Sequence, residues 1–340
     1  MAVPSAPIYF DPRWVGQHGI GRFASEVTAR LPAAVPLQII GRKLGPCDPL
    51  AISLALAGKQ TGIYFSPGFN PPLCSRIPFT FTIHDLIHLH VADESSAVRR
   101  MFYRHVVLPA TQRAHTVFTV SEFTKNQIIE WSGVAAEQIQ VVGNGLSSAF
   151  APAGPRHSPG CPYFLHVGRR VAHKNIFRLL EAFRASRAGH EAHLLFTGYE
   201  DRATVNHVKQ LGLEEKVRFT GPLSDEALAA VYRGAVALLF PSLYEGFGLP
   251  IIEAMACGTP VLTSNITAMP EVAGHDAALQ VDPYQVESIR DSLNKLVDDE
   301  ELRRRLRENG LIRSADFNWS RTAHSVARRL AVTHADSNKD

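Results

Sequence analysis

The fold is decided by VALLFPSLYEGFGLPIIEAMACGTPVLTS (residues 236–264), in which two short apolar runs enclose one helical segment. VALLF is wholly apolar, which is typical of parallel strands covered on both faces, and PVLTS is expected to form a further strand. Between them, IIEAMAC has the spacing of a helix, and Pro250 suits the first turn of that helix. A strand, a helix and a second strand in this order predict a doubly wound α/β sheet.

The same alternation extends along the rest of the chain. In the second half we expect further strands at 163–168, 193–198, 217–221 and 278–281, and helices at 175–186, 203–211, 226–235 and 270–274. The first half is less regular, with strands expected at 7–10, 62–67, 79–85 and 116–121 and helices at 21–31, 97–108 and 124–131. Each half therefore carries enough strands and helices to build a sheet of its own.

A boundary between two domains is expected at APAGPRHSPGCP (151–162), because this segment is rich in proline and glycine. It separates an N-terminal α/β domain over 1–152 from a C-terminal α/β domain over 163–315. A helix is expected over 316–334, and it could pack back on the N-terminal domain. Two such domains would enclose a cleft, and ligands of open α/β sheets bind at the carboxyl ends of the strands.

The composition is that of an ordinary globular protein: 340 residues, 45% hydrophobic and 20% charged, with a net charge of +3. This charge is too small to argue for a nucleic acid partner. The sequence has no apolar run of about 18 residues and no basic, apolar leader, so we expect neither a membrane span nor a secretory signal. Four widely separated cysteines disfavour zinc sites and a disulfide framework, which favours a cytoplasmic protein.

Two carboxylates, Glu245 and Glu253, lie eight residues apart in the expected loop and helix of the segment 236–264. The glycines between them would let a ligand approach the main chain, and the helix start would favour a phosphate. Glu253, one turn into the helix, could accept hydrogen bonds from sugar hydroxyls beside that phosphate. Glu245 would lie nearer the reacting centre. A tight turn with two surface acids is the other interpretation of this pattern.

EGFGLPIIE (245–253) resembles the paired-glutamate motif of retaining glycosyltransferase family 4. Further segments resemble the family in the same order: YFDPRWVGQHGIGRFASEV (9–27), TIHDLIHLH (82–90), TVSEFTKNQI (119–128), VVGNGLSSAF (141–150) and HVGRRVAHKNIFRLLEAF (166–183). The resemblance implies the α/β fold called GT-B, in which two Rossmann-like domains face each other across a cleft. The N-terminal domain would lie on the acceptor side, and the C-terminal domain would bind a nucleotide sugar.

The resemblance assigns the donor diphosphate to Arg169 and Lys174, two cations that could stabilise it as it leaves. Arg170 is an alternative to Arg169, and a solvated basic loop is the alternative to both roles. Glu253 would hold the donor ribose. The sugar ring would be held by Glu245 and its loop: Gly246, Phe247, Gly248 and Leu249. With two cations and a helix start at the phosphates, and no D-x-D pair in the sequence, we expect no divalent metal and no cofactor.

In the N-terminal half, HDLIHLH (84–90) follows a predicted strand, and the resemblance places His84 at the transferred sugar. Asp85 could orient His84 or bind the acceptor. A metal site or a packed strand end are the alternatives for these histidines. Gly19 and Gly21 would form a loop over the donor phosphates, although a lone G-x-G is weak evidence. Donor contacts are also expected at Gly198 and, near the nucleobase, at Leu223.

We therefore expect a retaining glycosyltransferase that moves a hexose from a nucleotide diphosphate sugar to a glycan or lipid-linked acceptor. Bacterial mannosyltransferases of surface polysaccharide synthesis begin with a similar sequence, and this favours GDP-mannose as donor. The alternatives are UDP-sugars or dTDP-rhamnose as donor, and a catalytically silent sugar-binding partner of a synthase complex. A nicotinamide oxidoreductase is disfavoured, because the first strand is not followed by G-x-G-x-x-G.

The segment 97–113 combines four arginines with apolar residues, so a helix there would have a basic and an apolar side. A helix that packs on the core is one interpretation. A patch that binds the inner face of the membrane is the other, and it would make the protein peripheral.

Overall fold

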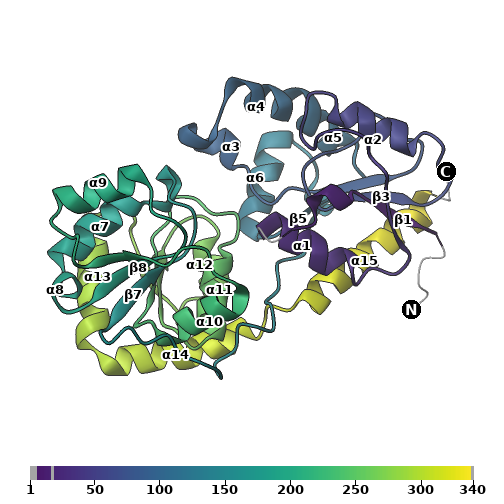
Figure 1. Ribbon diagram of the computed structural model, residues 1–340. Helices are drawn as coiled ribbons and strands as arrows, with labels where there is room; N and C mark the ends of the chain where they lie inside the picture. Colours follow the sequence, from purple (N-terminus) through teal and green to yellow (C-terminus); the bar gives the residue numbers. More distant parts are fainter. Residues whose placement is uncertain (1–5, 17–18, 338–340) are drawn as a thin grey trace. The chain divides into compact units, whose positions relative to one another are not determined.

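The structure is a computed structural model that describes residues 6–16 and 19–337. The chain divides into unit 1, residues 1–145 with 318–340, and unit 2, residues 146–317. Both units appear in Figure 1, and each is described by itself. The division falls before the segment 151–162, so this proline-rich segment belongs to unit 2, whereas the C-terminal helix belongs to unit 1.

Unit 1 is built on a six-stranded sheet of order β2-β1-β3-β4-β5-β6, in which all neighbours are parallel. Its strands are β1 (Ile8–Phe10), β2 (Ala34–Pro36), β3 (Ile63–Ser66), β4 (Phe79–Thr82), β5 (Thr116–Thr119) and β6 (Ile139–Val141). The chain leaves β1 for β2 on one side and returns to β3 on the other. The order of strands therefore reverses between β1 and β3, and such a switch point opens a crevice at the carboxyl ends.

Helices cover both faces of this sheet. They are η1 (Pro12–Trp14), α1 (Gly19–Thr28), α2 (Asp48–Leu56), α3 (Ile87–His90), η2 (Ala92–Glu94), α4 (Ala97–Phe102), η3 (Tyr103–Val107), α5 (Leu108–Arg113), α6 (Glu122–Ser132), η4 (Ala136–Gln138) and α15 (Trp319–Ser337). On one face, α1 and α15 lie side by side (Figure 1), and their Phe23 and Trp319 join one apolar cluster with Phe65 of β3. The C-terminal helix is thus part of the unit 1 core.

Unit 2 has a second six-stranded parallel sheet, of order β12-β11-β10-β7-β8-β9. Its strands are β7 (Tyr163–His166), β8 (His193–Phe196), β9 (Val217–Phe219), β10 (Leu238–Phe240), β11 (Val261–Ser264) and β12 (Leu279–Val281). The chain builds β7, β8 and β9 outward and then returns to place β10 beside β7. The switch point of this sheet therefore lies between β7 and β10.

Alternate residues of these strands point to opposite faces, so both faces of the unit 2 sheet are apolar and covered. The helices are η5 (Ala172–Lys174), α7 (Ile176–Ala185), α8 (Ala188–Glu191), α9 (Arg202–Gln210), α10 (Asp225–Gly234), α11 (Leu249–Ala256), α12 (Met269–Ala273), α13 (Val286–Asp298) and α14 (Glu300–Ser314). Phe164 of β7 packs with α7 and α13 in one apolar cluster. Figure 1 shows α10, α11 and α12 on the other side of β7 and β8.

The prediction of doubly wound α/β sheets in both halves is confirmed. The helix expected over 97–108 is confirmed and continues to Arg113, but a π-helical turn, η3, lies between α4 and α5. Pro109 explains this: it has no N–H, and its ring would clash with the carbonyl of residue 105 in a regular α-helix. Within the described ranges, no helix is long and apolar enough to cross a membrane.

Candidate functional site

The candidate site of unit 2 lies where its strand order reverses. β7 and β10 are parallel neighbours, and the loops that follow them carry the residues 168–174 and 241–248. A backbone hydrogen bond joins the two loops, because the Leu243 N–H donates to the carbonyl of His173 at 2.7 Å. The sheet thus brings together two segments that lie about seventy positions apart, at the place where open α/β sheets bind ligands.

Lys174 and Glu245 form an ion pair across these loops. The Lys174 Nζ donates to Glu245 Oε1 at 2.6 Å, and the two side chains are 14% and 13% exposed. The ammonium also lies 4.7 Å from the ring centroid of Phe240, the last residue of β10. Because both partners are largely shielded from water, their attraction is stronger than that of a surface pair. Two of the predicted donor residues therefore meet in space.

The structure distinguishes the two arginines of this loop. Arg170 is held in place, since its Nε donates to Asp201 Oδ2 at 2.6 Å and its Nη1 to the carbonyl of Thr197 at 2.8 Å. Partial burial acts to raise the pKa of Asp201, but hydrogen bonds from Thr204 and Arg170 outweigh it and lower that pKa. Arg169 is exposed, and its side chain has no ion pair or hydrogen bond to any described residue. Arg169 is therefore the cation left available to a ligand.

Helix α11 begins beside this pair. Its N-cap residue is Gly248, with φ +98°, a conformation that favours glycine. No side chain of the described residues caps this helix start, and Pro250 occupies the first turn. Uncapped amides and the positive end of the helix dipole together suit an anion. Gly246, Phe247, Gly248 and Leu249 thus lie at the start of the helix, as the sequence predicted.

Glu253 lies one turn into α11 and is only 6% exposed. Tyr232 of α10 donates its hydroxyl to Glu253 Oε2 at 3.1 Å. The Thr259 hydroxyl in turn donates to the carbonyl of Tyr232 at 2.6 Å. The carboxylate is thus fixed by a tyrosine that sequence reasoning missed, since nothing in EALAAVYRGA marks Tyr232 as more than a core residue.

His166 ends β7 directly before this loop and is fully buried between Phe196 and Phe240. Neither ring nitrogen has a hydrogen-bond partner among the described residues. Burial, together with the nearby charges of Lys174 and Arg170, lowers the pKa of His166 to about 3. The imidazole is therefore neutral at physiological pH and adds no charge beneath the two cations. Sequence reasoning missed this residue as well, although a histidine that ends an apolar strand is a visible signal.

The two predicted glycine positions differ in what they do. Gly198 pairs with Gly221 through two backbone hydrogen bonds of 2.9 and 3.2 Å, beyond the ends of β8 and β9, and Leu223 follows half-buried. In unit 1, Gly19 begins α1, and a Cβ on Gly21 would come within 2.8 Å of Gly16. Gln17 and His18 of the same predicted loop lie outside the described residues.

His84 follows β4 in unit 1 and is 8% exposed. Its Nε2 lies 2.8 Å from the carbonyl of Pro67, and its ring meets Phe23 edge-on at 4.9 Å. His88 bonds through Nδ1 to the carbonyl of Glu94 at 2.8 Å, and Asp85 accepts from the N–H of Ile87 at 3.1 Å. In the part of the chain that the structure covers, no three His, Cys, Asp or Glu side chains are placed to hold a metal. The proposed roles of His84, Gly19 and Gly21 toward the donor stay predictions.

The switch point of unit 1 contains a buried polar network that sequence reasoning did not identify. Asp11 follows β1 and accepts from Arg13 Nη2 and from Asn70 Nδ2, both at 2.7 Å. Asp48 pairs with the same Arg13 nitrogen at 2.7 Å. Asn70 also accepts from the Trp14 indole at 2.6 Å. Asp11 and Asn70 are fully buried, so this crevice is filled by side chains that satisfy one another.

The two doubly wound domains define a two-domain α/β protein, and the switch point of unit 2 has a geometry that suits an anion. Comparison with known proteins identifies the class further. The family model "Glycosyl transferases group 1" matches residues 151–313, and "Glycosyltransferase Family 4" matches residues 59–150. The chain belongs to the glycosyltransferases that these two models describe together, so it is a glycosyltransferase.

Several curated relatives are mannosyltransferases by name. "O-antigen chain mannosyltransferase B" of Escherichia coli is 32% identical over 299 residues, 84% of this chain and 77% of its own length. "Serotype-specific mannosyltransferase WbdA" of Escherichia coli is 30% identical over 263 residues, 71% of this chain but 32% of its own length. The chain thus spans about a third of WbdA and most of the first relative.

Solved structures show the same fold at lower sequence identity. Sucrose-phosphate synthase of Thermosynechococcus elongatus has a TM-score of 0.77 at 21% identity, covering 95% of this chain and 97% of that one. Anabaena HepE in complex with UDP and glucose has a TM-score of 0.75 at 18% identity, covering 96% and 100%. The fold is therefore GT-B, as the resemblance implied.

Proposed function

We propose that this glycosyltransferase is a retaining mannosyltransferase that transfers mannose from GDP-mannose to a hydroxyl of a glycan or lipid-linked glycan. The observation that carries the proposal is the Lys174–Glu245 pair at 2.6 Å, at the switch point of unit 2 and beside the uncapped start of α11. The sugar is chosen from the relatives, several of which are named mannosyltransferases.

The donor diphosphate is bound by fixed positive charge in this proposal. Lys174 and Arg169 contribute two cations, and the amides of residues 246–249 contribute the positive end of α11. Glu253 accepts hydrogen bonds from the ribose hydroxyls, and Tyr232 keeps its carboxylate in one orientation. Glu245 holds Lys174 in place and hydrogen-bonds the sugar ring. No divalent metal is required, because protein cations take the role that magnesium has in other nucleotide sites.

Transfer breaks the bond between the sugar C1 and the diphosphate oxygen and forms a bond from C1 to the acceptor oxygen. The departing diphosphate gains negative charge, which Lys174 and Arg169 stabilise more strongly in the transition state than in the bound donor. The acceptor oxygen attacks from the face that the diphosphate leaves, and the acceptor proton passes to a departing phosphate oxygen. The configuration at C1 is therefore retained without an enzymic nucleophile.

A panel of nucleotides and donors tests the proposal. GDP, UDP, dTDP and ADP are compared by thermal shift, and a nucleotide at 100 times its Kd should add roughly 2.7 kcal/mol of stability. GDP-mannose, UDP-glucose and dTDP-rhamnose are then compared by release of the nucleoside diphosphate. We expect GDP and GDP-mannose to give the largest signals, and the anomeric signal of the product, measured by NMR, to match that of the donor.

Each other outcome overturns a named part of the proposal. A preference for UDP or dTDP changes the donor, and an inverted product removes the retaining mechanism. Loss of activity with EDTA and recovery with magnesium contradict metal independence. If GDP binds but no donor is either transferred or slowly hydrolysed, the result favours the catalytically silent sugar-binding partner.

For helix α4 we propose contact with an anionic membrane surface. None of its residues is buried, and its Val98 and Met101 are 76% and 61% exposed. Arg99, Arg100 and Arg104 are exposed around them, as in helices that bind at the membrane interface. We expect co-sedimentation with vesicles that contain phosphatidylglycerol but not with phosphatidylcholine vesicles. Co-sedimentation of the double variant V98D/M101D at the wild-type level would contradict this proposal.

A further inference from the structure

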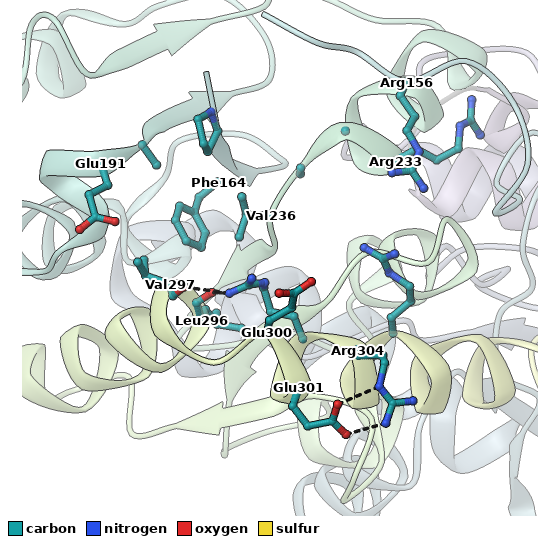
Figure 2. A pocket seen from close by; sticks show the side chains of 16 residues that line it. Arg156, Phe164, Glu191, Arg233, Val236, Leu296, Val297, Glu300, Glu301 and Arg304 are labelled. Carbon is teal, nitrogen blue, oxygen red and sulfur yellow. Dashed lines mark hydrogen bonds and ion pairs between the residues drawn. The ribbon is translucent and has the colours of Figure 1, made fainter. Parts of the chain in front are cut away.

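A cavity of about 830 Å³ lies in unit 2 (Figure 2), near the residues that precede several strands of its sheet. Pro162, Ala192 and Val236 line it, and they precede strands β7, β8 and β10 respectively. The donor residues follow strands β7 and β10 instead. Because all strands of this sheet are parallel, the cavity and the donor residues lie at opposite ends of the strands. The cavity is therefore a separate place in the fold.

Two arginines of this cavity are held by backbone carbonyls. Arg233 is only 7% exposed and donates through Nε to Pro155 at 2.7 Å and through Nη1 to Ala151 at 3.0 Å. Arg303 donates through Nη1 to the carbonyls of Leu296 and Val297 at 2.7 and 2.9 Å. These hydrogen bonds fix the direction of each guanidinium. They do not neutralise its charge, since a carbonyl has no net charge to offer.

Two further arginines of the cavity, Arg156 and Arg307, have exposed side chains. Arg156 belongs to the proline-rich segment 151–162 and Arg307 to α14, and both line the cavity. Neither side chain has an ion pair or a hydrogen bond to any residue that the structure covers. Figure 2 shows Arg156 and Arg233 together on one side of the cavity. Both free guanidinium groups can therefore turn toward a ligand.

The carboxylates of the cavity do not balance these charges. Glu191 is paired with Arg187 at 2.9 Å, and Glu301 is paired with Arg304 at 2.5 Å. Glu300 is the one lining carboxylate without such a partner in the described ranges. Four lining arginines, at positions 156, 233, 303 and 307, thus face a single uncommitted carboxylate. A cation as buried as Arg233 is normally compensated by a carboxylate or another anion.

Size and wall chemistry narrow the class of ligand. The volume lies within the range of small-molecule sites, roughly 300–1,000 Å³. Pro162, Val236 and Val297 give the cavity an apolar wall, against which the flat face of a ring can pack. Guanidinium forks match the oxygens of a phosphate in geometry and in charge.

We propose that this cavity is a second binding site, for a phosphorylated small molecule, in which Arg156 and Arg307 bind the phosphate oxygens within the positive field of Arg233 and Arg303. The organic part of the ligand packs against Pro162, Val236 and Val297. A sugar phosphate and a nucleotide share this chemistry. The site does not depend on the proposed mannosyl transfer, because none of its residues belongs to the donor site.

Calorimetry with inorganic pyrophosphate tests this site, and it needs no sugar donor. The double variant R156A/R307A removes two exposed side chains, so it should fold as the wild type does. We expect pyrophosphate binding at this cavity to weaken by at least about tenfold, because two charge-assisted contacts are lost. R305A is the matched control, since Arg305 is an exposed arginine of the same helix that does not line the cavity.

A second variant separates the two anion sites of unit 2. K174A weakens pyrophosphate binding at the donor site, and we expect the binding event that is lost in R156A/R307A to persist in it. Titrations of glucose 6-phosphate and of AMP into the K174A variant then distinguish the two sources of the ligand. The proposal is overturned if R156A/R307A, R305A and the wild type give the same isotherm, or if K174A abolishes all pyrophosphate binding.

Discussion

The two sheets have the same kind of switch point but fill it in opposite ways. In unit 2, between β7 and β10, Lys174 pairs with Glu245, whereas the Arg169 side chain and the start of α11 have no side-chain partner among the described residues. In unit 1, between β1 and β3, Asp11 and Asn70 are fully buried in a closed polar network. The unit 2 crevice therefore offers a cation to a ligand, whereas the charged groups of the unit 1 crevice pair with one another.

This difference shows that topology provides the crevice but side chains decide whether it can accept a ligand. A ligand that entered the unit 1 crevice would have to break hydrogen bonds of 2.6 to 2.7 Å among buried groups. A ligand at the unit 2 crevice meets Arg169, whose side chain has no partner among the described residues, and a helix start that no described side chain caps. We therefore expect changes in unit 2 to alter activity and changes in the unit 1 network to alter stability.

The largest expected effect is on activity, in the variant K174A. Loss of this cation should slow sugar transfer by about 10²–10³-fold, as for the loss of one donor that stabilises a developing negative charge. The rate is measured as release of nucleoside diphosphate at saturating donor. K209A, an exposed lysine of α9 without partners in the described ranges, is the control and should keep the wild-type rate. A rate of K174A within threefold of the wild type would contradict the assignment.

The next effect is on stability, in the variant N70L. The substitution removes one buried donor to Asp11 and leaves the Trp14 indole without its partner in the unit 1 core, so the free energy of unfolding should fall by about 3 kcal/mol. Urea denaturation measures this loss. N126L, at an exposed asparagine of α6 in the same unit, should stay within about 0.5 kcal/mol of the wild type. If N70L were as stable as N126L, the network would not hold the crevice closed.

A smaller effect is expected on nucleotide affinity, in the variant Y232F. The ring and its edge contact with Phe150 are kept, and the hydrogen bond to Glu253 is lost. We expect the Kd for the donor nucleotide to rise about fivefold, which corresponds to about 1 kcal/mol. Calorimetry measures this change, with Y284F, at an exposed tyrosine, as the control. An unchanged Kd would show that Glu253 does not need Tyr232 for its orientation.

The smallest effect is a change of stability with pH that originates at His166. Its pKa is about 3 in the folded protein against 6.5 when unperturbed, so the unfolded chain takes up the proton first as the pH falls. The stability associated with the neutral ring is complete above pH 6.5 and is lost progressively toward pH 3. Between pH 7.5 and 6.0 the loss should be about 0.8 kcal/mol.

The variant H166L isolates this contribution. We expect its free energy of unfolding, from urea denaturation at several pH values, to fall less steeply with acid than that of the wild type. Parallel curves for the two proteins would mean that His166 takes up its proton at the same pH in the folded protein as in the unfolded chain. That result would place another positive charge beneath the unit 2 crevice.

The regular parts of the fold were predictable because their signals are local. Strands such as 163–168 and 193–198 are continuous apolar runs, and the helix at 175–186 repeats its apolar residues with helical spacing. The three-residue strands β2 and β6 were not predicted, since so few residues show no periodicity. Helices α13 and α14, in a highly charged part of the chain, were also missed.

The candidate site was predictable where its residues share a motif. Glu245 and Glu253 belong to one stretch, and the cations Arg169 and Lys174 to another. Supporting residues escaped prediction when their partners are distant, as for Tyr232, which is 21 positions from Glu253, and Asn70, which is 59 positions from Asp11. A hydrogen bond across such a separation leaves no pattern in the sequence around either residue.

By itself, the sequence determined the class of fold, the order of its strands and helices and the motifs at their ends, because apolar periodicity, glycines and prolines act within a few residues. Only the tertiary structure decided which charged side chains are paired within the protein and which are available to a ligand. It paired Arg170 with Asp201, left the Arg169 side chain without a partner among the described residues, and placed Asn70 in the unit 1 crevice, where it donates to Asp11. The reason is physical: a side chain is satisfied or available according to its neighbours in space, and packing alone sets those neighbours.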